Sequence, residues 1–183
     1  MNTAVMAGEF LFNCYGFDLR FWTSVSAFVE PALVFLRHFQ TDVAQGGSVL
    51  TIQFEEVASR AEVPVTRSVG SKVLFSGEQP SLGDTMRPLW HCEIVQDGNR
   101  LIADFHEQGV LVIDGARNLV EGYFVRPDTM HPDVCTSFFH FALSELLKRN
   151  GLYTVHATAL EYQGRGVLIS GYSGQGKTTS FLS

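Results

Sequence analysis

The chain has 183 residues with a formal net charge of −6 at pH 7, and 45% of the residues are hydrophobic. This apolar fraction excludes an intrinsically disordered chain, since enough apolar surface is available to form a core. The acidic balance and the lack of a lysine- or arginine-rich run argue against nucleic acid as a partner, and no stretch approaches the ~20 apolar residues of a membrane span. Residues 1–10 lack the layout of a secretory signal, so we expect a cytoplasmic protein with no membrane partner.

The first third of the chain carries signals for two strands and a helix. Apolar and polar residues alternate over Gly16–Trp22 and again over Leu50–Glu55, which predicts two half-buried strands. Between them, apolar residues from Val25 to Phe39 recur at three- and four-residue steps. This spacing predicts an amphipathic helix, which Pro31 either starts or kinks.

The middle of the chain predicts an antiparallel meander. A short strand at Lys72–Phe75 and a surface loop from Ser76 to Pro88, rich in glycine and proline, precede it. Asp-Gly pairs beginning at Asp97 and Asp114 supply the positive backbone angles that tight hairpins need. The expected strands of the meander are Trp90–Val95, Arg100–His106, Val110–Ile113 and Leu119–Val125.

A second helix is expected from Pro132 to just before Gly151. Proline and aspartate suit the positive N-terminal end of a helix, while Lys148 and Arg149 suit its negative end. The broad apolar face of this segment predicts that it packs against a sheet. The strands expected after this helix are Tyr153–Val155, Ala157–Tyr162 and Val167–Ser170.

The motif that carries chemistry is Gly171–Thr178, which reads GYSGQGKT. Two glycines separated by four residues and followed by lysine and threonine form a complete P-loop, or Walker A, motif. Backbone N–H groups of such a loop point at phosphate oxygens, Lys177 reaches the β- and γ-phosphates, and the Thr178 hydroxyl coordinates Mg²⁺. The sequence therefore predicts binding of ATP or GTP with Mg²⁺. The predicted nucleotide contacts are Gly171, Ser173, Gly174, Gln175, Gly176, Lys177, Thr178 and Thr179.

The chain ends six residues beyond Lys177, at Ser183. The rest of the helix that follows a P-loop, and the acidic residues that hold Mg²⁺, would lie beyond this point. We therefore expect a C-terminally truncated site, which binds nucleotide weakly and is catalytically inactive by itself.

The stretch from His156 to Thr178 resembles the HPr kinase/phosphorylase family in the order of its parts. A histidine and a small residue, a strand, a glycine turn, the strand Val167–Ser170 and a loop of the form G-x-S-G-x-G-K-S/T follow one another as they do in that family. The resemblance implies a P-loop kinase with a core similar to phosphoenolpyruvate carboxykinases, which transfers a nucleotide phosphoryl group to a serine of a small protein or peptide. It also implies that His156 lies near the phosphate site and that His156 and Lys177 take part in catalysis.

HPr kinases typically follow the loop with serine and glutamate, whereas this chain has Thr178 and Thr179. We therefore favour a kinase-like relative over a true HPr kinase, and two alternatives stay open: a P-loop ATPase or GTPase switch, and a non-catalytic nucleotide-sensing module. We expect an α/β fold in which residues 1–126 form a strand-rich α+β region that serves substrate recognition or homo-oligomer contacts. Residues 127–183 then form a linking helix and the incomplete start of the P-loop domain.

The other candidate residues are better explained by structural roles than by a functional site. Asp104 and His106 share a face of a predicted strand but lack a third metal ligand, so we expect an exposed polar face. Asp133 is explained as favourable charge at a helix N-terminus, where His131 and His140 also lie nearby. We further expect Trp22, Trp90 and most phenylalanines in the core, and Cys14, Cys92 and Cys135 as reduced, buried thiols.

Overall fold

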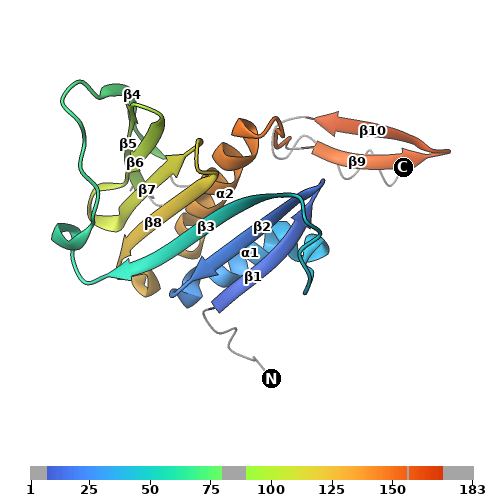
Figure 1. Cartoon of the computed structure of the whole chain (residues 1–183), viewed down its shortest axis with the longest axis horizontal. Coiled ribbons are helices and arrows are strands. Elements are labelled where there is room, and N and C mark those ends of the chain that lie inside the picture. The colour runs from blue at the N-terminus through green and yellow to red at the C-terminus, as the bar shows by residue number, and fades with distance from the viewer. Residues whose placement is uncertain (1–7, 80–89, 156, 171–183) are drawn as a thin grey trace, which may run out of the picture.

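The computed structural model describes residues 8–79, 90–155 and 157–170, and it is a mixed α/β structure dominated by one large sheet (Figure 1). The strands of that sheet are β1 (Gly8–Cys14), β2 (Phe17–Thr23), β3 (Ser48–Val57), β4 (Lys72–Gln79), β5 (Trp90–Asp97), β6 (Arg100–Asp104), β7 (Gly109–Asp114) and β8 (Leu119–Val125). Their order in space is β1-β2-β3-β8-β7-β6-β5-β4. Strand β3 pairs in parallel with β2 and β8, and the other neighbours are antiparallel.

Two α-helices lie on the same side of the sheet, behind the strands in Figure 1. They are α1 (Val29–Leu36) and α2 (Pro132–Arg149), and the short 3₁₀ helices are η1 (Ser26–Phe28), η2 (Arg37–Phe39), η3 (Arg60–Glu62), η4 (His106–Gln108) and η5 (Pro127–Thr129). No helix in the described ranges has the length and apolar character needed to cross a membrane.

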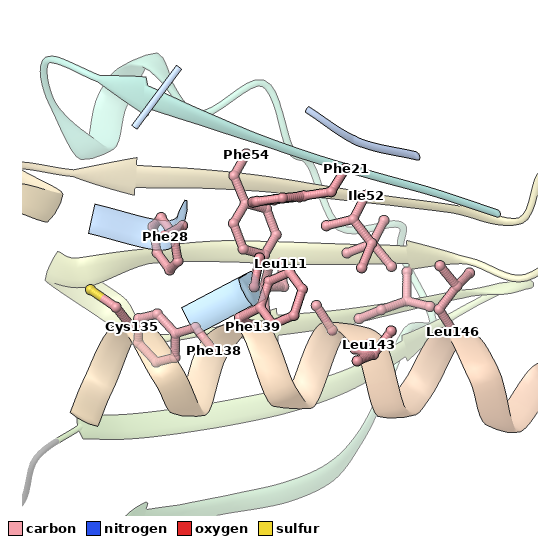
Figure 2. Packing of buried hydrophobic residues seen from close by; sticks show 14 of the residues in the cluster. Phe21, Phe28, Ile52, Phe54, Leu111, Cys135, Phe138, Phe139, Leu143 and Leu146 are labelled. Carbon is pink, nitrogen blue, oxygen red and sulfur yellow. The ribbon is translucent and has the colours of Figure 1, made fainter. Parts of the chain in front are cut away.

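The core between sheet and helices is rich in aromatic side chains. Phe54 of β3 meets the rings of Phe21, Phe28, Phe124 and Phe139 at centroid distances of 4.7–6.2 Å, mostly edge to face. This is the geometry that aromatic pairs favour. Figure 2 shows α2 contributing Phe138, Phe139, Leu143 and Leu146 to the same cluster. The second helix therefore shares one core with the strand-rich region.

Gly122 of β8 makes this aromatic packing possible. A Cβ at this position would lie 2.6 Å from Phe54 Cδ1 and 2.7 Å from Phe124 Cε2. Both separations are far below van der Waals contact, so a side chain here would displace the rings above it. The absence of a side chain thus lets the rings of Phe54 and Phe124 pack closely against β8.

Local sequence signals define the ends of α2. The Nδ1 atom of His131 accepts a hydrogen bond from the backbone N–H of Asp133 at 3.2 Å, and Pro132 occupies the first turn. At the other end, the Leu152 N–H donates to the Leu147 carbonyl at 3.0 Å and the Gly151 N–H donates to the Lys148 carbonyl at 3.2 Å. These two bonds form a Schellman motif. The predicted bounds of this helix are confirmed.

The opposite face of the sheet is partly covered by residues 58–71, which we call the strap. Val63 and Val65 of the strap pack on four buried valine and isoleucine side chains of β5, β6 and β7. Arg60 Nη2 lies 2.7 Å from Asp104 Oδ2, and Arg67 bridges Asp104 and Glu93. Cation and carboxylate pairs with a small apolar cluster therefore hold the strap on the sheet.

Several local predictions are wrong. The expected helix from Val25 to Phe39 is split into η1, α1 and η2, and Pro31 lies buried inside α1. Strand β4 continues to Gln79, so the loop expected from Ser76 begins later. Tyr153–Val155 is not a strand, because this segment has no ladder partner among the described residues. Strand β1 was not expected at all.

Two tryptophans were expected in the core, but only one packs there. Trp90 lies against Phe105 and Phe138 at centroid distances of 5.5 and 6.4 Å. Trp22 is 37% exposed, because it alternates with the buried Phe21 and points to the face of β2 that the helices do not cover. The strap reaches only the far half of that face.

Candidate nucleotide-binding site

A separate β-hairpin leads to the P-loop motif. It consists of β9 (Ala157–Tyr162) and β10 (Arg165–Ser170), which are antiparallel. Gln163 and Gly164 form its turn with φ values of 52° and 75°, the two positive angles that a tight two-residue hairpin needs. In Figure 1 the hairpin extends away from the large sheet, and within the described ranges its strands pair only with each other.

The hairpin is apolar on both faces. Cross-strand pairing places Val167 opposite Leu160 on one face and Leu168 opposite Ala159 on the other. Leu168 is 65% exposed and Val167 is 49% exposed. A continuous Val-Leu-Ile run is typical of a strand covered on both faces, as in a parallel α/β sheet. The expected strand before the loop is confirmed, and it extends from Arg165 to Ser170.

The predicted site residues follow this strand directly. Ser170 is the last residue of β10, and the motif begins at the next position. Gly171, Ser173, Gly174, Gln175, Gly176, Lys177, Thr178, Thr179 and His156 lie outside the described residues. The described part of the site is therefore its strand and the segment that connects the strand to α2.

The connection from α2 to the hairpin is anchored on the helix. Gly151 has a φ of +78° and reverses the chain after the last helical turn. Three residues later, Thr154 Oγ1 lies 3.2 Å from Ser144 Oγ, so that a hydroxyl pair ties this segment to α2. Thr154 is thus held against the helical layer, three positions before the described hairpin begins at Ala157.

Asp104 is not on an exposed polar face, so that prediction is wrong. Its carboxylate accepts hydrogen bonds from Arg60, Arg67 and the backbone N–H of His106, which hold it beneath the strap. His106 lies in η4 rather than in the strand, with a φ of +52°. Among the described residues, no group of three or more histidine, cysteine, aspartate or glutamate side chains is arranged to hold a metal ion.

The remaining candidates have structural roles. His131 and Asp133 cap α2, while the ring of His140 stacks on Phe35 at 5.0 Å. Burial lowers the pKa of His140. The three cysteines are free and buried, as expected, and burial raises the pKa of Cys14 and Cys135 to about 11 and that of Cys92 to about 12. Such thiols are not nucleophiles at neutral pH.

One feature was not predicted from the sequence. An open groove of about 430 Å³ runs beside α2. Its lining residues are Trp90, Ser137, His140, Phe141, Ser144 and Thr154. These residues come from a strand, a helix and a connecting segment. The sequence indicates only that positions 137, 141 and 144 lie on one side of the helix.

Comparison with known proteins identifies no relative. No protein-family model, curated protein or solved structure matches this chain significantly.

Proposed function

We propose that the chain binds ATP or GTP through Gly171–Thr179 and belongs to a serine kinase that modifies a small protein or peptide. The complete Walker A sequence at residues 171–178 carries this proposal. It is supported by β10, an apolar strand that ends at the residue before the motif. A strand followed by the glycine-rich loop is the context in which this motif binds phosphate.

Different residues of the motif bind different parts of a Mg²⁺-bound triphosphate. Backbone N–H groups around Gly174 and Gly176 bind phosphate oxygens, and the ammonium of Lys177 neutralises charge on the β- and γ-phosphates. The hydroxyl of Thr178 is a hard oxygen donor of the kind that Mg²⁺ prefers. His156 lies just before the hairpin in the sequence, and we assign it to the phosphate site on the basis of the family resemblance.

Nucleotide binding is tested by titrating the 183-residue chain with MgATP and MgGTP in a calorimeter. We expect weak, saturable binding that Lys177→Ala weakens at least tenfold, because the lysine contacts two phosphates. Lys72→Ala is the matched control, since it removes the same charge from the exposed strand β4. Equal affinities of the Lys177→Ala variant and the unmodified chain would overturn the proposal.

Phosphoryl transfer is tested in a protein that includes this chain together with the remaining elements of a P-loop domain. Labelled ATP and serine-containing acceptor peptides should give phosphoserine. Release of inorganic phosphate without peptide labelling would instead support the ATPase or GTPase switch. Binding without either product would support the nucleotide-sensing module.

A further inference from the structure

The groove beside α2 has walls without a net charge. Five of its six lining residues carry no ionisable side chain in the neutral pH range, and the sixth is His140. Partial desolvation lowers the pKa of His140, which favours the neutral form of this imidazole. A charged group seated in the groove would lose water without gaining an ionic partner, so the walls disfavour ions.

Aromatic rings form the apolar part of the groove, and buried neighbours hold them in place. Trp90 and Phe141 both meet Phe105 edge on, with interplanar angles of 89° and centroid distances of 5.5 and 6.5 Å. Phe105 is itself only 3% exposed. Rings supported in this way offer preformed surfaces for stacking, which is the usual character of a small-molecule site.

Hydrogen-bonding groups are interspersed with these rings. Ser137, Ser144 and Thr154 line the groove, and each hydroxyl can both donate and accept. The indole N–H of Trp90 is buried and has no acceptor among the described residues. Because this N–H is inaccessible to solvent, the three hydroxyls rather than the indole offer hydrogen bonds to a ligand in the groove.

We propose that this groove binds an uncharged heteroaromatic ring with hydrogen-bond donors and acceptors at its edge, of the nucleobase or nucleoside class. A planar ring matches the aromatic walls, its edge atoms match the hydroxyls, and its neutrality matches the lining. A volume of about 430 Å³ accommodates such a ligand. The proposal does not rest on nucleotide binding by residues 171–179.

The test is adenosine binding followed by ¹H–¹⁵N correlation spectra of the full 183-residue chain. The two tryptophans give two indole N–H signals, which Trp22→Phe assigns, and Trp22 serves as an internal control because it faces the other side of the sheet. We expect a saturable shift of the Trp90 signal alone, caused by a ring stacked on the indole, with a midpoint on the order of 1 mM. Ribose, which lacks the ring, should leave the Trp90 signal unchanged.

Variants locate the binding. Ser144→Leu fills the groove with a good helix former, so the helix should be retained while adenosine affinity falls at least tenfold. Thr136→Leu, on the same helix outside the groove, should leave affinity unchanged. No saturable shift of the Trp90 signal, or an unchanged affinity in Ser144→Leu, would overturn the proposal. Loss of adenosine binding in Lys177→Ala would also overturn it, because the ligand would then belong to the loop.

Discussion

The large sheet and the β9–β10 hairpin both contain antiparallel strand pairs, yet their apolar side chains differ greatly in exposure to solvent. Leu50, Ile52 and Phe54 of β3 are 0% exposed, whereas Leu168 of β10 is 65% exposed. The large sheet with its two helices therefore carries the core, while the hairpin carries the strand that precedes the candidate phosphate loop. Stability and nucleotide binding should accordingly respond to different substitutions.

The largest expected contrast comes from truncating one leucine in each region. Leu50→Ala should lower the free energy of unfolding by about 2–5 kcal/mol, because it leaves a cavity under the aromatic cluster. Leu168→Ala should change it by less than about 0.5 kcal/mol, as exposed positions generally do. Urea denaturation followed by circular dichroism measures both. Equal losses would show that the hairpin belongs to the cooperative core.

Glycine substitutions give a smaller contrast of the same kind. Gly122→Ala should destabilise the fold by about 1–3 kcal/mol, since its methyl group would overlap Phe54 and Phe124. At Gly166 of β10 a Cβ would meet no atom within 4 Å, so Gly166→Ala should stay within about 0.5 kcal/mol. Thermal denaturation compares the two variants. A neutral Gly122→Ala would mean that the rings above the sheet move aside freely.

The sequence predicted elements whose signals are local. Pro132, Asp133 and Gly151 delimit α2, because capping preferences act over a few residues. Both Asp-Gly pairs lie at turns of the meander, but only Gly98 has a positive φ, of 60°, whereas in the second turn the positive φ falls on Asn118 rather than on Gly115. The strand before the P-loop was predicted for the same reason. The loop itself could be interpreted only by its motif, which specifies chemistry directly through residue type and spacing.

The missed features depend on contacts between distant residues. Asp104 is buried because Arg60 and Arg67 of the strap cross the sheet to reach it. Trp22 is exposed because no segment of the described ranges covers its half of the same face in this way. The groove is lined by both Trp90 and Thr154, which are separated in the sequence by the whole of α2. No local pattern encodes which loop covers which strand.

A third and weaker comparison is between the half of the sheet face that the strap covers and the half of the same face that it leaves open. Arg67→Gln removes the bridge to Asp104 and Glu93 and should cost about 0.5–1 kcal/mol, since these partners are partly exposed. Hydrogen exchange should then rise in residues 58–71 but not in β2. High salt should reduce the effect. Unchanged exchange in the strap would show that the valine contacts and the Arg60–Asp104 pair hold it without Arg67.

The smallest expected effect is on the dependence of stability on acidic pH. The Gln45 N–H, the Asn13 amide and the Gly46 N–H hydrogen-bond the Asp18 carboxylate and lower its pKa below 3.8. Its stabilising contribution is therefore complete well above pH 3.8 and is lost as the pH falls through the lower folded-state pKa. Asp18→Asn should flatten the fall in stability between neutral and acidic pH, whereas the exposed Asp128→Asn should not. Identical pH profiles of the two variants would exclude this role.

Hydrogen exchange with and without MgATP tests most directly whether nucleotide binding is confined to the region that follows the hairpin. Nucleotide should slow exchange in peptides that contain Gly171–Thr179 and leave β1 to β8 unchanged, and Lys177→Ala should abolish the slowing without altering the free energy of unfolding. Unchanged exchange in the loop peptides, or equal slowing in Lys177→Ala, would contradict the proposed nucleotide site.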